Sequence, residues 1–222
     1  MRMARRIGWT LLTLLLLGLG YAAWDVFAPL QTSLRSFDPV EVAQLEARMW
    51  RSYYEQKPMP LYLQLARLLR TEYDLPYLRS HRVAFDAAKA AFVFKRGKRR
   101  SDYEQAIPPL VQYYAQIRGV SKERFDVAHA ARLEVEWWIV HRERKRMPPT
   151  ELPRALAALQ AELYGLGEEE FLDHARLRAQ AMTLRDDQAE AGGLTEADWL
   201  RIEDLLLESW KSLHRVVNSG GA

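Results

Sequence analysis

Residues 127–140 read VAHAARLEVEWWIV, and apolar side chains recur in this stretch on every side of a helix. A helix that is apolar all round is surrounded by other helices. The stretch therefore predicts a helix packed inside a bundle. His129, Glu134 and Glu136 interrupt the apolar pattern. His141 follows it directly, and each of these polar groups needs a partner if it is buried.

These polar residues form a candidate buried polar or metal cluster. Histidine and glutamate are the metal ligands of many helical bundles. Glu134 and His141 are seven residues apart and therefore share one helix face. The same spacing places His129 and Glu136 together. Glu46, on an earlier predicted helix, would add a further carboxylate, but the sequence leaves the identity of any metal unknown.

A structural ion-pair network is the competing interpretation of this cluster. Di-iron bundles carry Glu-x-x-His on two helices, whereas this chain has one imperfect match, Asp126-x-x-His129, and no second. The resemblance to ferritin-like proteins is confined to the helical pattern. Candidate cations for the buried carboxylates are Arg48, Arg51 and Arg82. We therefore expect at least one of these carboxylates to contact an arginine of another helix, and we predict no cofactor.

Helix-start and helix-stop signals divide the chain beyond residue 38 into about eight helices. They are expected at about residues 39–56, 61–73, 77–94, 101–119, 121–146, 150–165, 168–190 and 195–218. The sequence shows no convincing strand and no regular repeat. It therefore predicts an all-α fold, with a single N-terminal transmembrane helix followed by an irregular multi-helix bundle.

Three of these boundaries depend on local signals. Ser101 and Glu104 have the spacing of a capping box, which predicts a helix start. Pro108 and Pro109 predict a kink or a restart inside that helix. Ser121 is expected to open the longest helix of the chain.

The N-terminus has the features of a membrane-spanning helix. Three arginines precede residues 7–24, which carry no charge. As a helix this run is about 27 Å long, close to the ~30 Å of a bilayer core. Trp9 and Trp24 lie near its ends, where indole rings favour the membrane interface. The arginines are expected to remain in the cytoplasm.

Two domains follow from this assignment. Residues 1–30 are expected to form a membrane anchor and the start of a connector. Residues 31–222 are expected to form an all-helical extracytoplasmic domain, periplasmic if the source is bacterial. A cleaved signal peptide is the alternative, although Tyr21 and Trp24 would crowd the cleavage site.

The composition excludes several classes of protein. The chain has 222 residues, of which 49% are hydrophobic and 11% aromatic, so it is not a disordered chain. It has no cysteine, which excludes disulfide scaffolds, cysteine nucleophiles and thiolate metal sites. The net charge is only +3 and the basic clusters lie beyond the anchor, so nucleic acid is not an expected partner.

A basic segment separates the third and fourth predicted helices. It contains five cations within six residues: Lys95, Arg96, Lys98, Arg99 and Arg100. Such a loop can bind lipid phosphates or an acidic partner. A solvated loop without a ligand is the alternative.

These observations favour a membrane-tethered accessory or scaffolding protein without catalytic activity. The expected partners are the membrane, through the N-terminal helix, and another protein. The first alternative is a metal-dependent helical enzyme built on the candidate cluster. The second is a helical module that binds a peptide or a lipid. The sequence does not indicate the oligomeric state.

Overall fold

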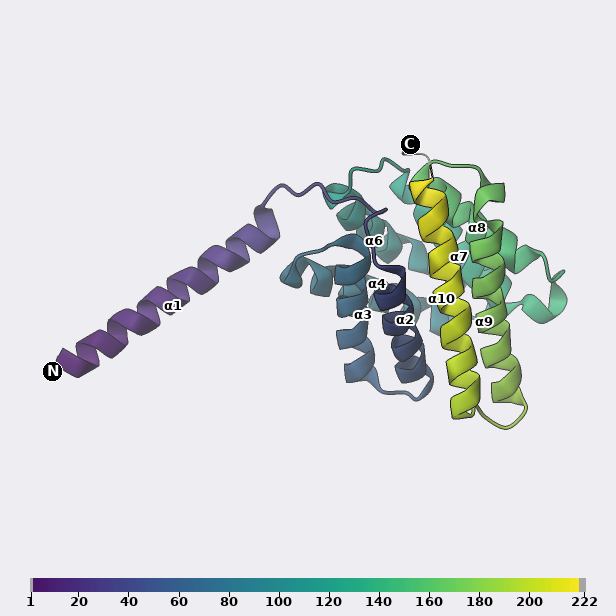
Figure 1. Ribbon diagram of the computed structural model, residues 1–222, viewed down its shortest axis with the longest axis horizontal. Coiled ribbons are helices and arrows are strands. Elements are labelled where there is room, and N and C mark those ends of the chain that lie inside the picture. Colours follow the sequence, from purple (N-terminus) through teal and green to yellow (C-terminus); the bar gives the residue numbers. More distant parts are fainter. Residues whose placement is uncertain (1, 220–222) are drawn as a thin grey trace.

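The computed structural model describes residues 2–219 (Figure 1). The longer helices are α1 (Arg2–Phe27), α2 (Pro39–Tyr54), α3 (Pro58–Tyr73), α4 (Tyr77–Arg96), α6 (Ile107–Val120), α7 (Val127–Arg142), α8 (Glu151–Tyr164), α9 (Leu172–Glu190) and α10 (Glu196–Asn218). Shorter elements are α5 (Arg100–Tyr103) and the 3-10 turns η1 (Glu104–Ala106), η2 (Arg144–Arg146) and η3 (Glu168–Phe171). Over the described residues the regular structure is entirely helical. The predicted all-α fold is confirmed.

The helices after α1 form a closed ring. Each longer helix from α2 to α10 packs against the next one along the chain. The last of them, α10, also packs against α2 and closes the ring. Figure 1 shows α2, α3, α9 and α10 nearer the viewer than α4, α6 and α7, while α1 projects away from the ring.

The helix that was expected to begin at Ser121 begins later. α6 ends at Val120, and α7 starts only after Asp126. The Asp126 carboxylate accepts hydrogen bonds from two backbone N–H groups in the first turn of α7, so Asp126 is the N-cap. Ser121 instead pairs with Thr32 in an isolated bridge. The prediction failed because this pairing keeps Ser121 outside a helix, and Asp126, five residues further along the chain, caps α7 instead.

The position of α7 also differs from the expected central one. α7 packs between α6 and α8 as one member of the ring. Side chains on its outer side are therefore open to solvent: His129 is 49% exposed and Glu136 is 40% exposed.

Three other predicted helix starts have different outcomes. Thr195 and Asp198 form a capping box, in which the Asp198 N–H donates to Thr195 Oγ1 and the Thr195 N–H donates to the Asp198 carboxylate. Pro108 and Pro109 lie in the first turn of α6, so the predicted restart is confirmed. Ser101 lies inside α5 and makes no cap, which contradicts the capping box expected there.

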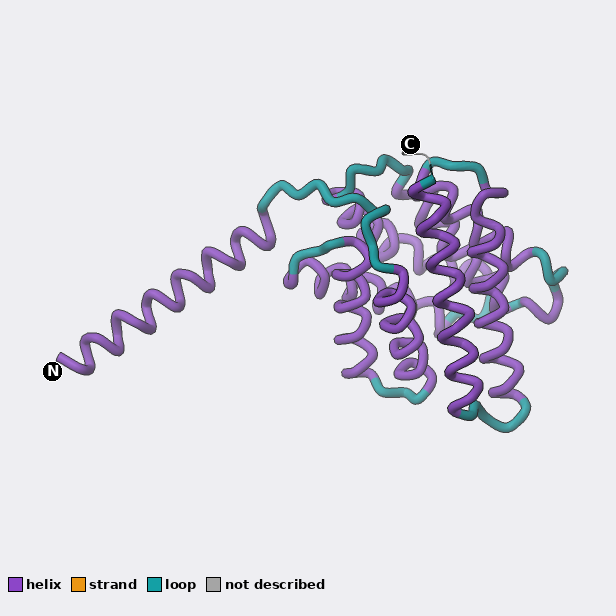
Figure 2. Tube along the Cα trace, viewed as in Figure 1, coloured by secondary structure: helices purple, strands orange, loops and turns teal. Residues whose placement is uncertain are grey.

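The connector between α1 and α2, drawn as a loop in Figure 2, is hydrogen-bonded to the ring. The Thr32 N–H donates to Val120 O at 2.7 Å, and the Lys122 N–H donates to Thr32 O at 2.8 Å. The side chains of Leu34 and Phe37 are buried in the core. The connector therefore contributes to the core rather than serving as a flexible linker.

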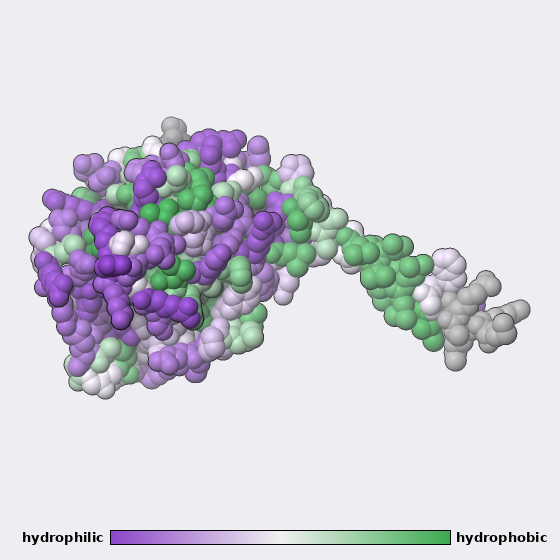
Figure 3. All heavy atoms as spheres, turned by 180° about the vertical axis from the view of Figure 1, so that it is seen from behind, coloured by the Kyte–Doolittle hydropathy of each residue, from purple (hydrophilic) through white to green (hydrophobic). Residues whose placement is uncertain are grey.

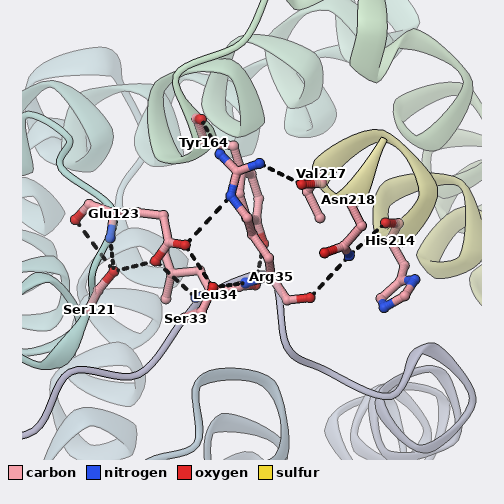
Figure 4. A network of polar contacts seen from close by, with 9 residues as sticks. All are labelled: Ser33, Leu34, Arg35, Ser121, Glu123, Tyr164, His214, Val217 and Asn218. Atoms are coloured by element: carbon pink, nitrogen blue, oxygen red, sulfur yellow. Dashed lines mark hydrogen bonds and ion pairs between the residues drawn. The ribbon is translucent and has the colours of Figure 1, made fainter. Parts of the chain in front are cut away.

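Glu123 binds the connector from the loop between α6 and α7 (Figure 4). Its carboxylate accepts from Ser33 Oγ at 2.8 Å, from the Leu34 N–H at 2.9 Å and from Ser121 Oγ at 2.9 Å. Burial raises the pKa of Glu123, but these hydrogen bonds outweigh it and the pKa ends below its ordinary value. The ionised carboxylate is thus the form that holds the connector.

Arg35 binds the other end of the same segment (Figure 4). Its guanidinium donates to Val217 O at 2.5 Å and to Tyr164 O at 3.0 Å. In return, Tyr164 Oη donates to Leu34 O, and Asn218 Nδ2 donates to Arg35 O. We call the contacts of residues 32–35 with the ring the connector clamp.

The C-terminal end of α1 is attached directly to α4. Asp25 is fully buried, and its carboxylate accepts from the Leu78 N–H at 2.8 Å and the Arg79 N–H at 3.1 Å. Pro76, the N-cap residue of α4, offers no side-chain acceptor, so Asp25 takes over that role from another helix. Arg79 donates in turn to Ala28 O. α1 and the ring therefore meet through specific contacts.

Replacing Glu123 by alanine is expected to lower the free energy of unfolding by about 1–3 kcal/mol, because the buried Leu34 N–H loses its acceptor. Chemical unfolding of the full chain in mild detergent, followed by circular dichroism, measures this change. Glu208→Ala is the matched control, since Glu208 contacts only Lys211 at the surface. Equal stability of the two variants would contradict the role of the clamp.

Candidate functional site

Three carboxylates and one guanidinium lie near one another among the ring helices. We call this set the central carboxylate cluster: Glu46 of α2, Glu72 of α3, Glu134 of α7 and Arg178 of α9. The charges of Glu46, Arg178 and Glu134 all influence the pKa of Glu72. Closure of the ring thus brings together residues that are far apart in the sequence.

Glu46 and Arg178 form a buried bidentate ion pair. Arg178 Nη1 donates to Glu46 Oε2 at 2.8 Å, and Nη2 donates to Oε1 at 2.5 Å. Trp210 Nε1 donates a third hydrogen bond to Glu46 Oε2 at 2.7 Å. Glu46 is only 2% exposed, so these donors replace the water that its charge would otherwise bind.

Aromatic rings flank the guanidinium of Arg178. Its central carbon lies 5.8 Å from the Trp50 ring centre and 5.9 Å from that of Trp210, within the range of a cation–π contact. Burial lowers the pKa of Arg178, but Glu46 outweighs it and the pKa ends above the ordinary value. Arg178 is therefore a fixed positive charge at the centre of the cluster.

Neutral donors hold Glu134. Tyr114 Oη donates to Glu134 Oε2 at 2.7 Å, and Trp138 Nε1 donates to Oε1 at 3.0 Å. Burial raises the pKa of Glu134, although these donors and the charge of Arg178 oppose the rise. Glu134 is thus satisfied by hydrogen bonds without a cation in direct contact.

Glu72 is the most perturbed carboxyl group of the cluster. Burial, together with the negative charges of Glu46 and Glu134, raises its pKa from 4.5 to about 8. Tyr73 and Arg178 lower the pKa, but by less. A carboxyl group in this state keeps its proton at neutral pH and exchanges it near pH 8.

The five residues of the predicted metal cluster do not come together. Glu46 binds Arg178 and Glu134 binds Tyr114 and Trp138, as described above. On the outer side of α7, His129 Nδ1 lies 2.7 Å from Glu162 Oε2. His141 Nε2 lies 3.0 Å from Asp186 Oδ2 at one end of the ring. Within residues 2–219, no group of three or more His, Asp and Glu side chains is placed to hold a metal ion.

Glu136 contacts an arginine, but not one of those expected. Arg100 of α5 donates to Glu136 Oε2 at 2.5 Å, in a pair that is open to solvent on both sides. Of the three arginines named from the sequence, Arg51 instead binds Glu55 and Glu196. Arg48 and Arg82 are exposed. The expected contact between helices exists, with a partner that helix spacing could not identify.

The basic segment is divided between a helix end and a short loop. Lys95 and Arg96 form the last turn of α4, where cations oppose the negative end of the helix dipole. Lys98 and Arg99 follow in the loop, and Arg99 pairs with Asp102. Arg100 opens α5 and is paired with Glu104 and Glu136. Intramolecular acids therefore partly neutralise the segment.

One helix of the described chain, over Arg6–Phe27, is long and apolar enough to cross a membrane. Its large apolar side chains are exposed, including Trp9 and Trp24 near the ends of the apolar run. Figure 3 shows the hydrophobic surface of α1 continuing to the point at which α1 meets the ring. The expected anchor thus has the length and surface that spanning requires.

Sequence reasoning missed Glu72 and Arg178. Glu72 follows Leu65, Leu68 and Leu69 at helical spacing, so the apolar face of α3 already indicated that it would point inward. Arg178 gives a weaker signal. In α9, charged residues and alanines are intermixed, so the sequence does not show which charged side chain points inward. Only closure of the ring identifies it as the partner of Glu46.

Comparison with protein-family models, curated proteins and solved structures finds no match to this chain. The fold and the site therefore define the class on their own. It is an all-helical protein in which one N-terminal helix, able to span a membrane, is joined to a closed helical ring with a central carboxylate cluster.

Proposed function

We propose that the chain is a single-pass membrane protein whose helical ring acts as an accessory or scaffolding domain without catalytic activity. In this proposal the N-terminus lies in the cytoplasm and the ring lies on the extracytoplasmic side. Another protein is the expected partner of the ring. The arginines at positions 2, 5 and 6, ahead of the uncharged run, support this orientation by the positive-inside rule.

The direct attachment of α1 to the ring is the observation that carries this proposal. Buried Asp25 caps α4, and the connector clamp holds residues 32–35. A domain that only needs to be near a membrane can be joined to it by a flexible linker. Contacts of this kind instead give the domain a defined orientation relative to its anchor, which suits a domain that presents a surface to a partner.

The central carboxylate cluster supports a structural role more than a catalytic one. Protein donors occupy both oxygens of Glu46 and both oxygens of Glu134. A catalytic carboxylate needs a free oxygen that can reach a substrate. We therefore assign Glu46, Glu134 and Arg178 to the stability of the ring.

A C-terminal alkaline phosphatase fusion tests the orientation, because this enzyme is active only outside the cytoplasm. In a bacterial host, we expect the phosphatase fusion to be active and a green fluorescent protein fusion at the same site to be dark. We also expect the chain to stay in the membrane pellet after carbonate extraction and to keep its N-terminal residues by mass spectrometry. An inactive phosphatase on an intact fusion would refute the orientation, and a shortened, soluble chain would favour the cleaved signal peptide.

A further inference from the structure

The outward face of α4 carries a regular stripe of exposed residues. We call them the α4 stripe: Leu78, Arg82, Phe85, Lys89, Phe92 and Arg96. Their spacing alternates between four and three residues, which places all six within a sector of about 80° around the helix. Apolar and cationic side chains alternate at every step of the stripe.

The apolar members of the stripe have no cover within the described part of the chain. Phe85 is 62% exposed and Phe92 is 58% exposed, and Leu78 is exposed as well. Large apolar side chains gathered on one surface mark an interaction site. The one acid of α4, Asp86, is outside the stripe and accepts a hydrogen bond from Gln116 of α6. The stripe is therefore apolar and positive without a negative group of its own helix.

The stripe begins where α1 ends. Leu78, its first residue, donates its backbone N–H to Asp25 in the last turn of α1. From Leu78 to Arg96 the stripe extends over about 27 Å. In the order of the ring, α4 lies opposite α9. Residues 147–222, which include α9, carry 7 Lys and Arg against 14 Asp and Glu, so the acidic part of the chain lies away from the stripe.

We propose that the α4 stripe rests on the surface of the bilayer that α1 crosses, with anionic lipid headgroups as its ligands. Leu78, Phe85 and Phe92 enter the boundary between headgroups and acyl chains, as apolar residues of interfacial helices do. Arg82, Lys89 and Arg96 bind the lipid phosphates around them. The proposal rests on the proposed function, because it requires α1 to span the membrane.

Single cysteines test this proposal, because the chain contains no cysteine. Phe85→Cys and Phe92→Cys, each labelled with an environment-sensitive fluorophore, report on the stripe. Leu200→Cys on α10 is the control, since Leu200 is 65% exposed but lies on another helix. The full chain is reconstituted in vesicles of phosphatidylcholine with or without phosphatidylglycerol. We expect spin-labelled lipid to quench the probes at positions 85 and 92, and iodide to quench the probe at position 200.

The cations are tested by the triple variant Arg82→Gln, Lys89→Gln, Arg96→Gln. In vesicles with phosphatidylglycerol, lipid quenching at position 85 should fall to the level of position 200. A matched triple variant removes exposed cations of α8, α9 and α10: Arg154→Gln, Arg176→Gln and Arg201→Gln. This control should leave the quenching unchanged. Added inorganic phosphate should not reverse the quenching, whereas reversal would show a site for free phosphate and overturn the lipid assignment.

The two proposals fail in different ways. Probes that stay open to iodide, in a chain that resists carbonate extraction, would overturn the stripe proposal and leave the anchor intact. They would indicate that the stripe serves a protein partner. Extraction of the chain by carbonate would overturn the proposed function. In that case the labelled chain is added to vesicles from outside, and absence of lipid quenching would overturn the stripe proposal as well. Circular dichroism confirms that each variant is folded.

Discussion

The free energy of unfolding is expected to fall by about 3–5 kcal/mol when Glu46 is replaced by alanine. The substitution leaves Arg178 charged and without a carboxylate partner inside the ring, and Trp210 Nε1 loses its acceptor. Urea unfolding of the full chain in mild detergent, followed by circular dichroism, measures the change. Arg178→Ala is expected to have a similar effect, because it leaves the buried Glu46 carboxylate without a cationic partner.

Burial, rather than the presence of an ion pair, is the cause of this large effect. Glu136→Ala is the matched control: Glu136 also binds an arginine at 2.5 Å, but at the surface. Glu136→Ala should lower the free energy of unfolding by less than about 1 kcal/mol. Glu46→Leu combined with Arg178→Met should cost less than either alanine variant, since no charge is stranded. If Glu46→Ala and Glu136→Ala were equally mild, water would reach the Glu46 pair and our description of the cluster would be wrong.

The stability of the protein is expected to decrease between about pH 5 and pH 8 through Glu72. The pKa of Glu72 is about 8 in the folded protein, against an ordinary value of 4.5. Between these values the folded chain holds a proton that the unfolded chain has released, so raising the pH favours unfolding. Below pH 4.5 both states are protonated, and above pH 8 both are ionised, so the dependence on this group ends at each limit.

Glu72→Gln isolates this contribution, because glutamine keeps the shape of the protonated side chain and does not ionise. The variant should match the wild type at pH 4.5 and exceed its free energy of unfolding by on the order of 2–4 kcal/mol at pH 9. Unfolding curves at several pH values measure the difference, with Glu208→Gln as an exposed control. A difference that does not change with pH would show that Glu72 ionises in its ordinary range.

The helical content and most helix ends could be predicted because their causes are local. Thr195 and Asp198, three residues apart, cap α10, and a proline pair can occupy only the first turn of α6. Ser121 failed as a helix start for a physical reason. Its hydroxyl donates to Glu123, and its backbone pairs with Thr32 of the connector. The residues around Ser121 give no indication that Thr32 is its partner.

The candidate site was harder to predict because its contacts cross the ring. Glu46 and Arg178 are 132 residues apart, and any of several arginines fitted the sequence. The periodicity of residues 127–140 correctly placed Glu134 among buried neighbours. The same periodicity misplaced His129 and Glu136, because it does not distinguish a helix enclosed by others from a helix in the wall of a ring.

Closure of the ring by α10 also sets the order in which the protein can fold. Glu46 and Trp210 are 164 residues apart, and Arg35 and Asn218 are 183 residues apart. Ribosomes add about 5–20 residues per second, so α2 waits on the order of ten to thirty seconds for α10 to be synthesised. During that interval the side of α2 that packs against α10 is uncovered, and Glu46 lacks the hydrogen bond from Trp210. Folding is therefore completed in a late step, and a ribosome that stops before α10 leaves a chain that chaperones and proteases treat as unfolded.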